Sequence, residues 1–153
     1  MDLTRRSCMT GLFGLPLLPS VASRNETKAA SLIVHARQQI GVTTLYDAAY
    51  VALDYPGGDV PEERGVCIDV IIRAYRQAFD FDFQQHVHED MAANFDAYPD
   101  RWGLTRTARN IDHRRVPNIE TWLERHGHEL PATDWQPGDL MTCRVGETLP
   151  HIG

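Results

Sequence analysis

Residues 65–79 read GVCIDVIIRAYRQAF, in which a glycine and a cysteine lead directly into an apolar run. The apolar side chains recur three and four positions apart, at Ile71, Ala74, Tyr75, Ala78 and Phe79. This spacing is typical of an amphipathic helix. Asp69 lies four residues before Arg73, a spacing at which opposite charges pair across one helical turn. The stretch therefore predicts a helix over residues 67–79 that starts at Cys67 and carries an Asp69–Arg73 ion pair.

Cys67 would lie in the first turn of this helix. There the helix dipole and the unpaired backbone N–H groups favour the thiolate, which is the nucleophilic form of cysteine. A nearby histidine can pair with the thiolate as an imidazolium and later give its proton to a leaving amine. Such a Cys–His pair suits acyl transfer or amide hydrolysis. A buried and chemically inert cysteine is the alternative interpretation.

The C-terminal residues 135–153, WQPGDLMTCRVGETLPHIG, indicate a β-hairpin. A strand over 140–145 follows a Pro-Gly turn, and after a turn at Gly146 a second strand opens at His151. Cys143 would face the core from the first strand. The hairpin would return His151 to the side of the first strand, which makes it the candidate base. Because the chain stops two residues later, we expect it to be a fragment of a longer protein or the product of a truncated reading frame.

Three further helices are expected. The first spans residues 29–39, with an N-cap at Thr27 and an inward face that ends at Ile40. The second is expected through Met91, Phe95 and Tyr98. The third is expected within residues 116–127, VPNIETWLERHG, with Pro117 near its first turn and Gly127 past its end. Helices followed by a terminal pair of strands imply an α+β domain.

The first 23 residues have the order of a signal peptide. Arg5 and Arg6 precede an uncharged stretch, residues 7–23, whose apolar part is too short to span a bilayer comfortably. The arginine pair also resembles the start of a twin-arginine leader. We therefore expect export to the periplasm, no membrane span after processing, and one mature domain over residues 24–153.

The composition restricts the class of partner. The chain has 153 residues and a formal net charge of -6, with a sequence pI of about 5.6. This leaves no broad cationic surface to neutralise phosphates, so we expect no nucleic-acid binding.

Once the leader is removed, Cys67 and Cys143 are the remaining cysteines. In an oxidising compartment a disulfide between them is the alternative to a free nucleophile.

Residues 86–90, HVHED, offer nitrogen and oxygen groups of the kind that bind zinc. Their spacing differs from HExxH, although Asp112 and His113 could add ligands. An acidic cluster at a helix start is the alternative, and we expect no metal.

Residues 112–115, Asp-His-Arg-Arg, form a second polar cluster. An arginine fork can bind a carboxylate through two parallel hydrogen bonds, and a muropeptide stem carries several carboxylates. The alternative is a surface loop in which Arg114 and Arg115 pair with Glu89 or Asp90.

Several motifs resemble known bacterial families. Tyr55, Gly57-Gly58 and Gly65 before Cys67, with PGDL and HIG much later, are similar to the NlpC-type branch of papain-like cell-wall cysteine peptidases. The longer stretches RGVCIDVIIRAYR, VHEDMAANFDAYP, NIDHRRVPN and DWQPGDL resemble the family called domain of unknown function 1287, over residues 40–153.

The resemblance implies a papain-like fold of helices packed on a small antiparallel sheet, with Cys67 as nucleophile and His151 as base. It implies hydrolysis of amide bonds in peptidoglycan stem peptides, without a cofactor. Val66 precedes the cysteine and Ile68-Asp69 follow it, where the NlpC-type motif has Asp and Ser-Gly. The third catalytic residue of that group comes from the strand after the histidine, which this chain does not reach.

Other residues are expected to bind substrate or support the site: Tyr55, Asp69, Arg73, His88, Glu89, Asp90, Asp112, His113, Arg114 and Arg115. Two alternatives to the hydrolase stay open. One is a non-catalytic module that holds stem peptides through Arg114 and Arg115, and the other is a metal-dependent hydrolase that uses residues 86–90.

Overall fold

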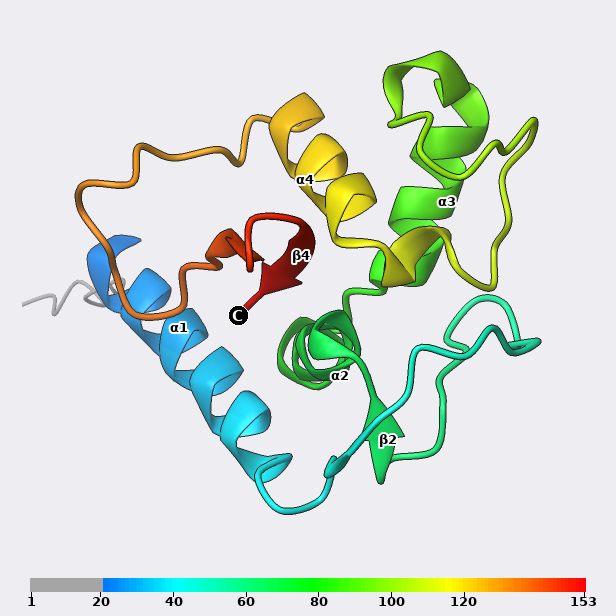
Figure 1. Cartoon of the computed structure of the whole chain (residues 1–153). Helices are drawn as coiled ribbons and strands as arrows, with labels where there is room; N and C mark the ends of the chain where they lie inside the picture. Colours follow the sequence, from blue (N-terminus) through cyan, green and yellow to red (C-terminus); the bar gives the residue numbers. More distant parts are fainter. Residues whose placement is uncertain (1–20) are drawn as a thin grey trace, which may run out of the picture.

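The computed structural model describes residues 21–153 (Figure 1). The predicted leader falls mostly on residues 1–20 and so lies outside this range. The elements in chain order are α1 (Val21–Gln38), β1 (Leu45–Tyr46), β2 (Arg64–Gly65), α2 (Cys67–Phe79), α3 (Phe83–Ala93), η1 (Phe95–Ala97), η2 (Asp112–Arg114), α4 (Val116–Arg125), β3 (Thr142–Val145) and β4 (Leu149–Ile152). Helices combined with two small sheets make this a mixed α+β fold, as the sequence predicts.

Within residues 21–153, no helix combines the length and the apolar character needed to cross a bilayer.

Helix α2 lies near the middle of the molecule and contacts α1, α3 and β4 (Figure 1). Its most buried side chains belong to one apolar core with α3, α4 and β4. The main members of this core are Ile68, Ile72, Phe83, Val87, Met91, Ile119, Trp122 and Ile152. Burial of each large apolar side chain contributes roughly 1.5–3 kcal/mol. The first turn of α2 is therefore anchored from several sides.

The predicted bounds of α2 and α4 are confirmed to within two residues. Helix α2 runs from Cys67 to Phe79 and ends where Asp80 takes a left-handed conformation, with φ 53°. In α4, Pro117 lies in the first turn and Gly127, with φ 70°, follows the end. These are the positions at which proline and glycine are most favourable.

The first helix differs from its predicted bounds. Helix α1 begins at Val21, so Thr27 lies inside it rather than at its start. The helix ends at Gln38, and Ile40 falls in the turn that follows and is 79% exposed. The inward position predicted for Ile40 is therefore wrong.

Helix α3 starts and ends earlier than predicted. Asp82 caps its N-terminus, because the Asp82 carboxylate accepts a hydrogen bond from the Gln84 N–H at 3.1 Å. The helix stops at Ala93, and Phe95 belongs to the separate turn η1. Asn94 leaves the helical region at φ -138°, and its side-chain amide donates back to the Asp90 carbonyl at 3.0 Å. This local bond offers the backbone an alternative to the next helical turn.

The two sheets have two strands each. In the antiparallel pair, Cys143 of β3 lies opposite His151 of β4, which confirms the predicted hairpin. Strand β4 begins at Leu149, two residues before the predicted start at His151. Three residues, Gly146 to Thr148, connect the paired Val145 and Leu149, and two of them, Gly146 and Glu147, have positive φ. The parallel pair of β1 and β2, in which Tyr46 lies opposite Gly65, is not foreseen by the sequence.

The predicted core position of Cys143 is wrong. Met141 and Val145, on the same face of the strand, are 47% and 51% exposed, and Cys143 itself is half-buried. The hairpin is anchored instead by Ile152 of β4, which is 1% exposed.

Candidate active site around Cys67

Cys67 is the first residue of α2, as the sequence predicts, and its thiol is half-buried. Val66 before it is extended, with φ -110° and ψ 174°, so the chain turns into the helix at the cysteine. The Val66 N–H donates to Asp69 Oδ2 at 2.7 Å, which satisfies one backbone group at the helix start. Cys67 and Cys143 are both free thiols, so no disulfide occupies the candidate nucleophile.

A buried ion pair holds the first turn of α2. Asp69 and Arg114 are 3% and 7% exposed, and their side chains meet through two parallel bonds. Arg114 Nε donates to Asp69 Oδ1 and Nη2 donates to Asp69 Oδ2, each at 2.9 Å. Arg114 also donates to the carbonyls of Ala49 and Asp47, at 3.0 and 3.2 Å. This arginine therefore joins η2, the loop after β1 and the start of the cysteine helix.

Arg73 has a different partner from the one predicted. It pairs with Asp59 at 2.7 and 3.1 Å and donates to the Val60 and Arg64 carbonyls at 3.0 and 3.1 Å. The predicted Asp69–Arg73 pair is wrong, because Asp69 turns back toward Val66 and Arg114. Arg73 instead holds residues 59–64, the loop that precedes Cys67, through hydrogen bonds.

Gly65 lies against the Asp69 side chain. It has φ 157°, and a Cβ there would come within 2.9 Å of Asp69 Oδ2 and 3.0 Å of Asp69 Cβ. A side chain would push the Asp69 carboxylate away from Val66 and Arg114. The glycine is thus required by the ion pair beneath Cys67.

We predict that Gly65→Ala lowers the free energy of unfolding by about 1–3 kcal/mol, through backbone strain and displacement of Asp69. Urea denaturation followed by circular dichroism measures the change. Gly127→Ala is the matched control, because Gly127 also has positive φ but a Cβ there meets nothing within 4 Å. A loss no larger than that of Gly127→Ala would contradict the role of crowding.

A carboxylate–imidazole pair lies on η2 and α3. Asp112 is fully buried; its Oδ2 accepts from the Ala108 N–H at 2.7 Å and lies 3.1 Å from His88 Nδ1. With Nδ1 donating to Asp112, the Nε2 of His88 keeps a lone pair. The ring of Tyr55 meets the His88 ring edge-on, with centroids 5.3 Å apart.

Tyr55 extends this polar group. Its hydroxyl lies 3.4 Å from Glu89 Oε1, and burial, followed by the charge of Glu89, raises the pKa of the phenol. Four of the residues expected to support the site are thus brought together: Tyr55, His88, Glu89 and Asp112. His88 and Asp112 are joined as partners, which spacing along the chain does not indicate.

His113, next to Asp112, is buried and Arg115 is half-buried, and each has contacts of its own. His113 is 2% exposed, and burial, together with the positive charge of Arg76, lowers its pKa from 6.5 to about 4. Arg115 places its guanidinium over the Trp102 ring, 4.0 Å from the centroid. Burial lowers the pKa of Arg115. His113 therefore stays neutral at physiological pH, and Arg115 is held by an aromatic face.

The side chains of the predicted metal-ligand cluster diverge. His86 stacks on Phe81 with ring centroids 4.3 Å apart, whereas His88 turns to Asp112. Asp90 pairs with Arg125 at 2.8 Å. Across residues 21–153, no group of three or more His, Cys, Asp or Glu side chains is placed to hold a metal ion.

His151 lies on β4, and its side chain is exposed. Strand β4 contacts α2 and α4, so the hairpin lies against the cysteine helix. In the part of the chain that the structure describes, no hydrogen bond joins the Cys67 thiol to the His151 ring. The fold therefore brings the strand of the candidate base to the helix of the candidate nucleophile, without a direct bond between the two side chains.

Sequence reasoning misses Gln84, which is fully buried in α3. Its Oε1 accepts from the Gly58 N–H at 2.8 Å and its Nε2 donates to the Asp54 carbonyl at 2.9 Å. A Cβ at Gly58 would overlap the Asp54 carbonyl oxygen. Gln84 thus fixes the Gly-Gly loop beside Tyr55. Gln84 lies three residues before Val87 and seven before Met91, and this helical spacing, which places it on the buried face of α3, is the signal that could have indicated it.

An α+β fold with a cysteine at the start of a central helix describes the class of this protein, and comparison with known proteins assigns its family. Residues 33–153 match the family described as Domain of unknown function (DUF1287), and the chain belongs to this family. It is 52% identical over 139 residues to the uncharacterized protein YijF of Escherichia coli strain K12. The match covers 88% of this chain and 67% of that relative. No solved structure matches.

Proposed function

We propose that this protein is an exported cysteine hydrolase of amide bonds in peptidoglycan stem peptides, built on a papain-like fold. The observation that carries the proposal is the position of Cys67, a free, half-buried thiol at the first residue of a helix anchored in the core. The arginine pair and apolar stretch within residues 1–23 support export to the periplasm.

In the proposed reaction, the Cys67 thiolate attacks the carbonyl carbon of a peptide bond. The unpaired backbone N–H groups of the first turn of α2 stabilise the negative oxygen of the tetrahedral intermediate. His151 gives a proton to the departing amine, which leaves an acyl-enzyme on the sulfur. A water molecule, deprotonated by His151, then releases the acid and restores the thiol.

The Asp69–Arg114 pair and the Arg73–Asp59 pair serve this chemistry by holding the thiol in place. Each is well buried on at least one side and fixes one segment beside Cys67. A nucleophile must be held in a fixed position, because a small displacement of the reacting group lowers the reaction rate by a large factor.

The two alternatives have less support. A non-catalytic module that holds peptides through Arg114 and Arg115 conflicts with the contacts of Arg114, whose carboxylate partner is Asp69. A metal-dependent hydrolase would need His86, His88 and Asp90 to converge, and these side chains have separate partners.

We predict that the purified protein releases soluble fragments from peptidoglycan sacculi, measured by liquid chromatography and mass spectrometry. Cys67→Ala should abolish release, because the acyl-enzyme cannot form, and His151→Ala should slow it by about 10²–10⁴-fold. Cys143→Ala is the control, since it removes the other described thiol and should leave the rate within about twofold. Equal release by the wild type and Cys67→Ala, or no release by either, would refute the proposal.

A further inference from the structure

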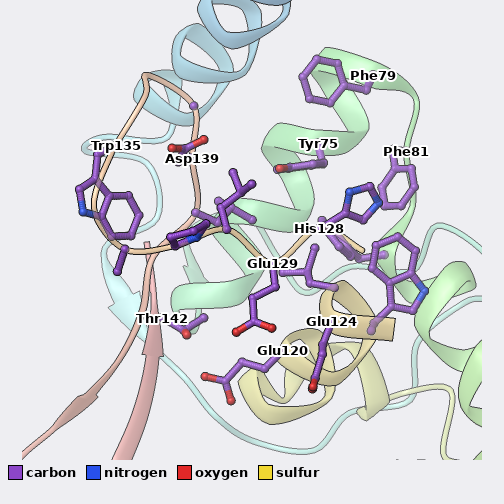
Figure 2. A pocket seen from close by; sticks show the side chains of 18 of the residues that line it. Tyr75, Phe79, Phe81, Glu120, Glu124, His128, Glu129, Trp135, Asp139 and Thr142 are labelled. Atoms are coloured by element: carbon purple, nitrogen blue, oxygen red, sulfur yellow. The ribbon is translucent and has the colours of Figure 1, made fainter. Parts of the chain in front are cut away.

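A cavity of about 790 Å³ lies between the C-terminal half of α2, α4 and residues 128–142 (Figure 2). This volume is within the range of about 300–1,000 Å³ typical of small-molecule sites. Neither Cys67 nor His151 lines it. Tyr75, on its wall, lies eight residues beyond Cys67, which corresponds to about 12 Å along the helix. The cavity is therefore a site separate from the candidate nucleophile.

The wall of this cavity is largely aromatic, and we call it the aromatic pocket. Figure 2 shows Tyr75, Phe81, His128 and Trp135 around the opening. Trp122 forms part of the same wall, and its ring lies 5.7 Å from Phe81 and 5.8 Å from His128 between centroids. Trp135 remains 54% exposed. A ligand with an apolar body would cover this exposed surface and gain its burial energy.

The charges of the aromatic pocket are predominantly negative. Glu120, Glu124, Glu129 and Asp139 line it, against one lysine, Lys28, and one histidine, His128. Glu120 is neutralised by Arg144 at 3.0 Å, but no salt bridge within residues 21–153 involves the other three carboxylates. The negative charge also acts on the aromatic wall. Burial raises the pKa of the Tyr75 phenol, and the charge of Asp139 raises it further.

We propose that the aromatic pocket binds an organic cation, an ammonium group carried on an apolar chain or ring. Aromatic faces attract such cations through their quadrupoles. The carboxylates of Glu124, Glu129 and Asp139, which form no salt bridge within residues 21–153, also attract a positive charge, although Asp139 accepts a hydrogen bond from the Gln136 N–H at 2.8 Å. An anion of the same shape would meet those carboxylates as like charges. Because the pocket excludes Cys67 and His151, the proposal stands independently of the hydrolase.

The test uses 4-phenylbutylammonium and, as a charge-reversed probe of similar shape, 4-phenylbutyrate. Binding is followed by nuclear magnetic resonance of the three tryptophan indole N–H groups. Trp122 and Trp135 line the pocket, whereas Trp102 lies beside Arg115 and serves as an internal reference. We expect the cation to shift Trp122 and Trp135 but not Trp102, with an affinity at least about tenfold that of the anion.

Two variants assign the binding to the pocket. Trp135→Ala should weaken the ammonium probe about tenfold and Glu129→Gln about threefold, because each removes one source of attraction. Glu62→Gln, an exposed carboxylate outside the pocket, should leave binding unchanged. Equal affinity for the two probes, a shift of Trp102 as large as that of Trp135, or no binding at all would overturn the proposal.

Discussion

Arg114→Ala is expected to lower the free energy of unfolding by about 3–5 kcal/mol, the largest loss of stability expected of any substitution named for this protein. The substitution leaves the Asp69 carboxylate buried without its two bonds from the guanidinium. It also leaves the Ala49 and Asp47 carbonyls without their donor. An uncompensated buried charge costs far more than the pair itself contributes, so the loss should exceed that of an ordinary truncation. Urea denaturation measures it directly.

Arg144→Ala is the matched control for this prediction. Arg144 also forms a two-bond pair with a carboxylate, that of Glu120, but both side chains are partly exposed. Solvent-exposed pairs contribute about 0.2–1 kcal/mol, so this loss should be small. A loss for Arg114→Ala no greater than for Arg144→Ala would show that the Asp69–Arg114 pair does not hold the helix start.

Acid is expected to destabilise the protein through His113. Its pKa is about 4 in the folded protein, below the value of 6.5 for an unperturbed histidine, because burial and Arg76 disfavour the charged ring. Between these two values the unfolded chain binds the proton more readily, so stability falls as the pH drops from about 6.5 to about 4. A difference of this size corresponds to roughly 3 kcal/mol when the full window has been crossed.

His113→Gln tests this assignment by removing the titrating group. The variant is expected to lose stability at neutral pH but to show a flatter dependence between pH 4 and 6.5 than the wild type. His128→Gln, at an exposed histidine, should keep the wild-type slope. The same slope in wild type and His113→Gln would assign the acid sensitivity to other groups.

The sequence predicts the elements whose signals are local. The bounds of α2 follow from its apolar period and from the Gly-Val-Cys turn before it, and the hairpin follows from the Pro-Gly and Gly146 turns. The position of Cys67 at a helix start therefore follows from residues 65–79 alone. The family assignment from long motifs is confirmed as well.

The pairing of charges could not be predicted in the same way. Spacing along the chain favours Asp69–Arg73, yet the partner of Asp69 is 45 residues away and that of Arg73 is 14 residues before it. An ion pair between residues four apart on a helix contributes only about 0.2–0.5 kcal/mol. A buried contact with two parallel hydrogen bonds is stronger and therefore determines the partner. The His88–Asp112 pair is missed for the same reason, because 24 residues separate its partners.

The contacts of Arg114 make the beginning of the cysteine helix part of a cooperative unit. The guanidinium bonds to groups 45, 65 and 67 residues away in the chain. Fraying of the first turn of α2 would therefore require release of the loop after β1 and of η2 as well. Helix ends ordinarily open at almost no cost in free energy, but this one is coupled to sub-global unfolding. The candidate nucleophile thus lies in a segment whose opening is rare.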